Sequence, residues 1–173
     1  VSATRASEVT PMAVTRVDKA ELAKQNLGQD LPFLLQYTPS MVVTSDAGAG
    51  VGYTGIRIRG SDPTRINVTV NGIPLNDAES HGVFWVNMPD FASSIDNIQI
   101  QRGVGTSTNG AAAFGASLNI QTNQLIDTAY AELGASFGSF NTQRQNVRFG
   151  TGLLKSGWAF DGRLSQISSD GYI

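Results

Sequence analysis

The sequence predicts a small α+β domain, followed by antiparallel strands that each have one apolar face. Three observations support this fold class. Two helix signals stand near the start of the chain, short alternating segments follow them to about residue 123, and longer alternating segments follow residue 125. Glycine accounts for 19 of the 173 residues, and charged residues for only 15%, a composition typical of close-packed strands and frequent turns.

The first helix is predicted over residues 19–27. Asp18 stands at the N-cap position and Glu21 follows three residues later, which is a variant of the capping box. Gly28 is placed to end the helix in a left-handed conformation. Start and stop signals therefore agree on this element.

A second, shorter helix is predicted over residues 31–37. Asp30 is expected to cap it, Pro32 fits its first turn and Pro39 stops it. The leucines of this segment fall on one face. Both helices precede most of the strands, as in an α+β domain.

Short alternating segments predict the strands of the first domain, and Asn71-Gly72 predicts a tight turn. Three long polar or glycine-rich loops, over residues 45–55, 76–87 and 103–115, separate these strands. Loops of this length are often functional. The predicted strands cover residues 12–17, 41–44, 56–59, 66–70, 98–101 and 118–121.

After residue 125 the alternating segments lengthen, over residues 130–138, 142–151 and 158–167. Apolar side chains occupy one face of each segment and polar side chains the other. Segments of about ten residues with this pattern are typical of transmembrane β-barrel strands. A soluble antiparallel sheet with one face on a core fits the pattern equally well. Three barrel strands cannot close, so the barrel interpretation makes this chain a piece of a longer protein.

Composition excludes several classes of function. The net charge of −2 and the pI near 5.2 argue against nucleic-acid binding, which needs a basic surface. The chain has no cysteine and one histidine, so thiolate and histidine-rich metal sites are ruled out. No catalytic constellation is present. We therefore expect no enzyme activity, no metal and no cofactor.

Several short motifs occur along the chain in the same order as in a known protein family. Ile58-Arg59-Gly60 matches an Ile-Arg-Gly motif, and residues 70–74 match a turn of the form hydrophobic-Asp-Gly-hydrophobic-Pro, with Asn71 in place of Asp. Together with the remaining stretches, these motifs make the chain resemble the plug and first barrel strands of a TonB-dependent outer-membrane receptor, of the Bacteroidetes type. The remaining stretches are residues 2–5, 14–26, 34–39, 41–43, 98–103, 110–115 and 118–120.

The resemblance implies a plug domain over residues 1–124 and the first strands of an incomplete transmembrane β-barrel over residues 125–173. It implies an active transporter in the outer membrane of a Gram-negative cell, with the plug filling the lumen and gating it. The implied partners are outer-membrane lipid, the rest of the barrel, an extracellular substrate of unknown class, and the TonB protein of the inner-membrane energising complex. The TonB box is expected before Val1 and most of the barrel after Ile173.

The resemblance also implies two groups of site residues. Arg59 and Arg102 would lock the plug to barrel glutamates, because a guanidinium binds a carboxylate through two hydrogen bonds. Without the resemblance, both read as solvated residues at strand ends. Plug apices would contact substrate, although for Phe84 and Trp85 a place in the core or on the barrel wall is the favoured alternative. The apex candidates are Tyr53, Asp77, Glu79, His81, Phe84 and Trp85.

Two other functions compete with the transporter. One is a soluble periplasmic or secreted binding module with a sheet of its own, and the other is an isolated interaction domain with a plug-like fold. These functions and the transporter differ in whether residues 125–173 need lipid or detergent, because a long apolar edge is an aggregation hazard in a soluble protein. The class of substrate stays open among siderophores, haem, cobalamin, glycans and peptides.

Overall fold

The computed structural model describes residues 12–104, 110, 112–122 and 124–171. Contacts between Cα atoms divide the chain into two units, Val1–Thr122 and Asn123–Ile173. The first unit has a mixed sheet with short helices and the second has antiparallel strands, which confirms the predicted fold class. The matching stretch at residues 2–5 lies outside the described residues.

The first unit is built on a five-stranded sheet with the order β1-β6-β7-β4-β5. All neighbours in this sheet are antiparallel except β4 and β7, which are parallel. A separate hairpin joins β2 and β3. The strands are β1 Ala13–Asp18, β2 Met41–Ser45, β3 Thr54–Ile58, β4 Ile66–Val70, β5 Ile73–Pro74, β6 Ile95–Arg102 and β7 Ala116–Thr122.

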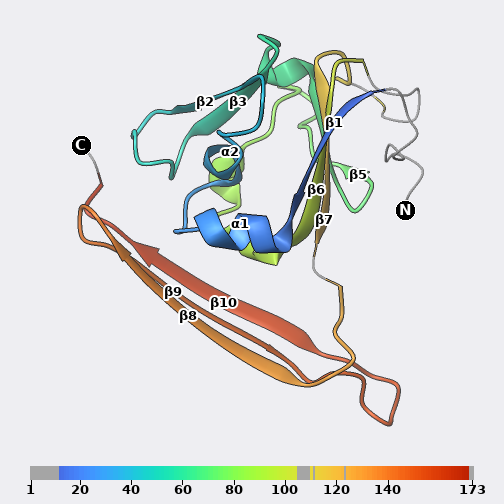
Figure 1. Cartoon of the computed structure of the whole chain (residues 1–173), viewed down its shortest axis with the longest axis vertical. Helices are drawn as coiled ribbons and strands as arrows, with labels where there is room; N and C mark the ends of the chain where they lie inside the picture. The colour runs from blue at the N-terminus through green and yellow to red at the C-terminus, as the bar shows by residue number, and fades with distance from the viewer. Residues whose placement is uncertain (1–11, 105–109, 111, 123, 172–173) are drawn as a thin grey trace. The chain divides into compact units, whose positions relative to one another are not determined.

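The helices of this unit are short, and in Figure 1 α1, α2 and the β2–β3 hairpin lie on one side of the sheet. No helix in the described part of the chain is long and apolar enough to cross a membrane. The helical segments are α1 Lys19–Gln25, α2 Leu31–Leu34, and the 3₁₀ turns η1 Pro63–Arg65, η2 Trp85–Asn87 and η3 Phe91–Ser94.

The two faces of the sheet differ in chemistry, although both are buried along β6 and β7. Register places Ile100 beside Leu118 on one face, and Gln99 beside Asn119 on the other. The apolar face joins leucines of α1 and α2 in one hydrophobic core. Side chains of the polar face bond to one another, as Thr69 Oγ1 does to Asn119 Oδ1 at 2.8 Å, which offsets the cost of removing them from water.

The start of α1 follows the prediction, but its end does not. Asp18 caps the helix, since its Oδ1 accepts from the Glu21 N–H at 2.8 Å. The helix ends at Gln25 instead of residue 27. There the Asn26 side chain accepts from the Gly28 N–H at 3.0 Å, and this local turn competes with further helix. Gly28 is left-handed, as expected.

The predicted cap of α2 is wrong. The Asp30 side chain makes no hydrogen bond to the helix start. Its Oδ2 instead accepts from Thr54 Oγ1 at 3.0 Å, across to the β2–β3 hairpin. Burial raises the pKa of Asp30, and hydrogen bonds from Thr54 and Gly52 oppose that shift. The helix is also shorter than predicted and ends at Leu34, where single turns replace it.

The second unit is a three-stranded antiparallel sheet with the order β10-β9-β8. Its strands are β8 Tyr130–Gly138, β9 Thr142–Gly150 and β10 Asp161–Ser168. β10 begins three residues later than predicted, because Trp158 and Phe160 lie in the connection between β9 and β10, where their rings stack. The predicted faces are confirmed by the register, which aligns Leu133, Val147 and Leu164 across the sheet.

A buried cation joins the three strands on the polar face of this sheet. The Arg148 side chain on β9 is only 3% exposed. Its guanidinium lies 4.9 Å from the centre of the Tyr130 ring and 3.5 Å from the Asp161 carboxylate. Glu132 lies 4.0 Å away, and the Tyr130 hydroxyl also bonds to Asp161. Because these partners come from β8 and β10, the cluster fixes the register of all three strands.

Candidate functional site

Loops gather at one end of the five-stranded sheet. The parallel strands β4 and β7 both start at this end, where β6 finishes. The Gly115 N–H donates to the Arg65 carbonyl at 2.9 Å, and the Gly103 N–H donates to the Gly115 carbonyl at 2.7 Å. These two bonds hold the end of the connection over residues 59–65, Gly115 and Gly103 together.

Arg59 sits in a tight turn at this end. It and Gly60 have φ values of 52° and 75°, and the Ser61 N–H donates to the Ile58 carbonyl at 2.9 Å. Two central residues with positive φ define a type I′ turn. The Arg59 N–H donates to the Ser40 carbonyl at 2.9 Å, so the turn is held from both sides.

The structure brings Arg102 close to Arg59. Arg102 Nη1 donates to the carbonyl of Pro39, the neighbour of Ser40, at 3.3 Å. A Cβ atom built on Gly103 would lie 3.1 Å from Arg59 Nη1, so the Arg59 side chain passes directly over that glycine. Among the described residues neither arginine has an ion-pair partner, and the buried Arg102 Nε has no hydrogen bond.

Asn76 ties the third loop to the same end. Its Nδ2 donates to the Ile66 carbonyl and to the His81 carbonyl, each at 2.9 Å, and its Oδ1 accepts from the Val68 N–H at 2.8 Å. One side chain thereby fixes His81 beside the start of β4.

The Asp77 carboxylate is hydrogen-bonded within its own loop. Asp77 Oδ1 accepts from the N–H of Glu79 at 3.1 Å, from the N–H of Ser80 at 2.7 Å and from Ser80 Oγ at 2.9 Å. These bonds, chiefly those from Ser80, lower the pKa of Asp77, with a smaller contribution from His81. The Asp77 carboxylate therefore closes its own turn.

An open hollow of about 520 Å³ lies where the loops meet. This volume is within the range of about 300–1,000 Å³ typical of small-molecule sites. Of the predicted apex residues, His81 lines it, and Asp77 and Glu79 do not. The lining residues are Thr64, Arg65, His81, Ala112 and Phe114.

The other predicted apex residues lie elsewhere. Tyr53 is exposed at the tip of the β2–β3 hairpin, the opposite end of β3 from Arg59. Phe84 is half exposed, whereas Trp85 is 4% exposed and belongs to the hydrophobic core. Burial removes Trp85 from contact with a ligand, in agreement with the alternative favoured from the sequence.

Sequence reasoning missed Arg65 and Phe114. Arg65 stands between two strands with no motif around it, and Phe114 stands in a glycine-rich stretch. Only the parallel pairing of β4 with β7 brings these two residues together. No periodicity in the sequence signals that pairing.

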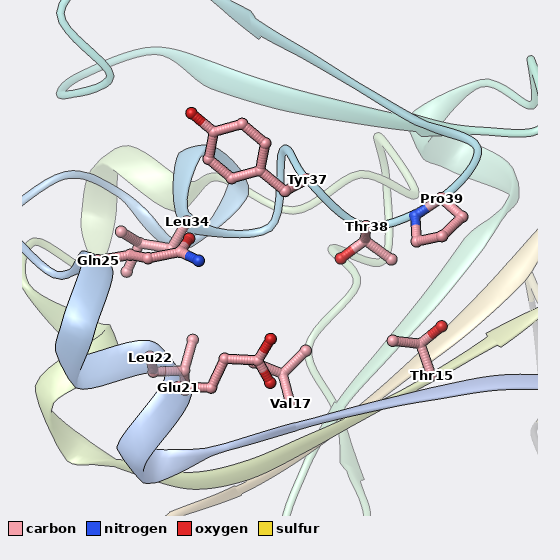
Figure 2. Close-up of a pocket in the computed structure, with 9 residues that line it drawn as sticks. All are labelled: Thr15, Val17, Glu21, Leu22, Gln25, Leu34, Tyr37, Thr38 and Pro39. Carbon is pink, nitrogen blue, oxygen red and sulfur yellow. The ribbon is translucent and has the colours of Figure 1, made fainter.

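A second, smaller hollow lies between β1, α1 and the turn after α2 (Figure 2). Its volume is about 140 Å³, below the range of small-molecule sites. Figure 2 shows the Glu21 carboxylate and the Thr38 hydroxyl at its edge. The lining residues are Thr15, Val17, Glu21, Leu22, Gln25, Leu34, Tyr37, Thr38 and Pro39.

Metal binding finds no support in the described ranges. No three residues among His, Asp and Glu come together there in a group that could hold an ion. The candidate site therefore consists of the hollow and the neighbouring pair of arginines.

Comparison with known proteins decides the family. Residues 6–117 match the model of the TonB-dependent Receptor Plug Domain. The chain belongs to this family. That membership places it in the outer membrane of a Gram-negative cell, as the resemblance predicted. The Bacteroidetes-type subgroup stays a prediction, as do the domain limits at residues 124 and 125.

Among the relatives of this chain, one is named as a transporter and another as a receptor. The vitamin B12 transporter BtuB of Vibrio vulnificus is 27% identical over 92% of this chain. The ferric-pyoverdine M114 receptor PbuA of a Pseudomonas species is 28% identical over 86% of it. The chain spans only 25% and 17% of these two proteins.

Solved structures of two receptors share the fold of this chain. The alcaligin outer-membrane receptor FauA of Bordetella pertussis matches with a TM-score of 0.71 at 20% identity, over 93% of this chain and 27% of its own. The siderophore receptor PirA of Acinetobacter baumannii matches with a TM-score of 0.68 at 20% identity, over 89% of this chain and 24% of its own.

Proposed function

We propose that this chain supplies the plug and the first barrel strands of an active transporter that the TonB complex energises. The family match supports the plug assignment. Strands β8–β10 support the barrel assignment, because Leu133, Phe137 and Leu164 expose 70–83% of their area on the apolar face. A soluble module would have to cover such a face, whereas lipid covers it in a barrel.

The observation that carries the gating role is the pair formed by Arg59 and Arg102. Neither guanidinium has a carboxylate partner in the described part of the chain, and the buried Arg102 Nε lacks an acceptor. Barrel carboxylates would supply both the partners and the acceptor. The pair thus holds the plug in the lumen with charge-assisted hydrogen bonds, which a pull from TonB breaks.

Substrate contact is proposed for the exposed apex residues. His81, Asp77, Glu79 and Phe84 lie in one loop at the end of the sheet that carries the arginine pair. Tyr53 would contact substrate from a different place, at the tip of its hairpin.

Fractionation tests the transporter. An antibody against residues 1–124 should detect, on a denaturing gel, a band several times heavier than 18.3 kDa in the outer-membrane fraction of the source cells. A soluble band near 18.3 kDa would overturn the proposal and favour the binding module.

Permeability tests the lock. In cells expressing the whole receptor, an Arg59→Gln/Arg102→Gln double variant should loosen the plug and increase sensitivity to vancomycin, which an intact outer membrane excludes. Arg57→Gln is the matched control, because Arg57 pairs with Asp62 inside the same unit at 3.8 Å. Equal vancomycin sensitivity of the double variant and the control, at equal receptor amounts, would rule out the locking role.

A further inference from the structure

We propose that the hollow lined by Arg65 and His81 selects an anionic ligand that carries a flat ring. The inference rests on the proposed substrate-receptor function and adds the chemical class of the substrate.

Among the described residues that line the hollow, Arg65 and His81 are the two that can carry charge, and none is an acid. Arg65 has no carboxylate within ion-pair distance among the described residues, so its guanidinium keeps its donors for a ligand. A guanidinium offers several N–H donors in a planar fork, which matches a carboxylate or similar oxyanion.

Two acids near the hollow, Asp62 and Asp77, already accept hydrogen bonds from their own turns. Asp62 Oδ1 accepts from the Thr64 N–H at 3.0 Å and from Thr64 Oγ1 at 2.9 Å, while its Oδ2 pairs with Arg57. The Thr64 bonds lower the pKa of Asp62, with smaller contributions from Arg57 and Arg65. Asp77 is likewise held by three donors of its own turn. Asp62 and Asp77 therefore each have an oxygen engaged within their own turn, and neither lines the hollow.

Phe114 supplies a place for a ring. Its side chain is 72% exposed although the residue lies only two positions before β7. An exposed aromatic face in a hollow that Arg65 and His81 also line suits a flat ligand, whose ring stacks while its oxyanion meets the guanidinium.

Probe molecules test this on the full 173-residue chain in detergent micelles. Salicylate joins a ring to an oxyanion, acetate has the charge without the ring, and benzylamine has the ring with the opposite charge. We expect salicylate to bind most tightly and to shift the imidazole NMR signals. These signals need no assignment, because His81 is the single histidine of the chain.

Variants localise the binding. Arg65→Gln should weaken salicylate about tenfold, as expected for the loss of a charge-assisted hydrogen bond. Arg65→Lys should retain part of the affinity, and Phe114→Ala should weaken salicylate but not acetate. The control Lys24→Gln removes an equal charge from the last turn of α1, outside the hollow, and should have no effect.

Two results would overturn the inference. One is benzylamine binding as tightly as salicylate, and the other is equal salicylate affinity in Arg65→Gln and the unsubstituted chain. Both measurements are independent of TonB and of cell fractionation. Failure of the anion site therefore leaves the transporter assignment standing, and a soluble 18.3 kDa band would overturn the transporter without touching the binding data.

Discussion

The five-stranded sheet and the three-stranded sheet show the same alternation of apolar and polar residues. The apolar residues are buried in the first sheet and exposed in the second. In the first, Ile100 and Leu118 are completely buried on the apolar face. In the second, Leu133 is 83% exposed and Phe137 is 77% exposed. Alternation therefore identifies which residues share a face, and it leaves open what covers that face.

The polar faces differ in the same manner. In the first unit, amide and hydroxyl side chains such as Gln99 and Asn119 are buried, and they form hydrogen bonds with other neutral side chains. In the second unit, the buried polar group is the charged Arg148, which two carboxylates and an aromatic ring surround. Neutral networks suit a compact domain, while a charged cluster on the polar face of barrel strands ties neighbouring strands together.

The largest expected effect separates the two apolar faces. Leu118→Ala should lower the free energy of unfolding by about 2–5 kcal/mol, because it leaves a cavity in the core. Leu133→Ala should change it by less than about 0.5 kcal/mol. Both are measured by urea unfolding in micelles through Trp85 fluorescence, in a Trp158→Phe background. A loss of equal size in Leu133→Ala would mean that another part of the chain covers its face.

Glycines give a second, smaller contrast. A Cβ on Gly115 would lie 2.3 Å from the Ser61 Cβ, an atom that cannot rotate away, and Gly115→Ala should cost about 1–3 kcal/mol. A Cβ on Gly134 would lie 2.2 Å from Asn146 Oδ1, the end of a flexible side chain. Gly134→Ala should therefore cost clearly less in thermal unfolding, and an equal cost would show that the Asn146 side chain is fixed.

The smallest expected effect concerns the pH dependence of stability. Because burial raises the pKa of Asp30 in the folded state, folding favours its protonated form. The contribution of Asp30 to stability is therefore fully present below about pH 4 and is lost as pH rises through the raised value. Asp30→Asn should remove this slope from urea-unfolding free energies measured between about pH 4 and 7, and the exposed Asp46→Asn should keep it. An unchanged slope in Asp30→Asn would contradict the assignment.

The site was only partly predictable. His81 and the two arginines stood out from the sequence, the arginines through motifs of a known family. Arg65, Phe114 and the hydrogen bonds that Asp77 accepts in its own loop did not, because they depend on the pairing of β4 with β7 and on local donors. The cap of α2 failed for a similar reason, since a distant threonine takes up the Asp30 carboxylate.

The sequence by itself determined the strands except β5 and the start of β10, the faces of those strands, the capped start of α1 and the Asn71-Gly72 turn, whose two residues both have positive φ. Those features depend on residues a few positions apart, where local sterics and hydrogen bonds decide the conformation. Only the tertiary structure decided which loops meet, which acids accept hydrogen bonds within their own turns, and which arginines come close to each other. Such contacts join residues that are distant in sequence, and one strand pairing positions many of them at once.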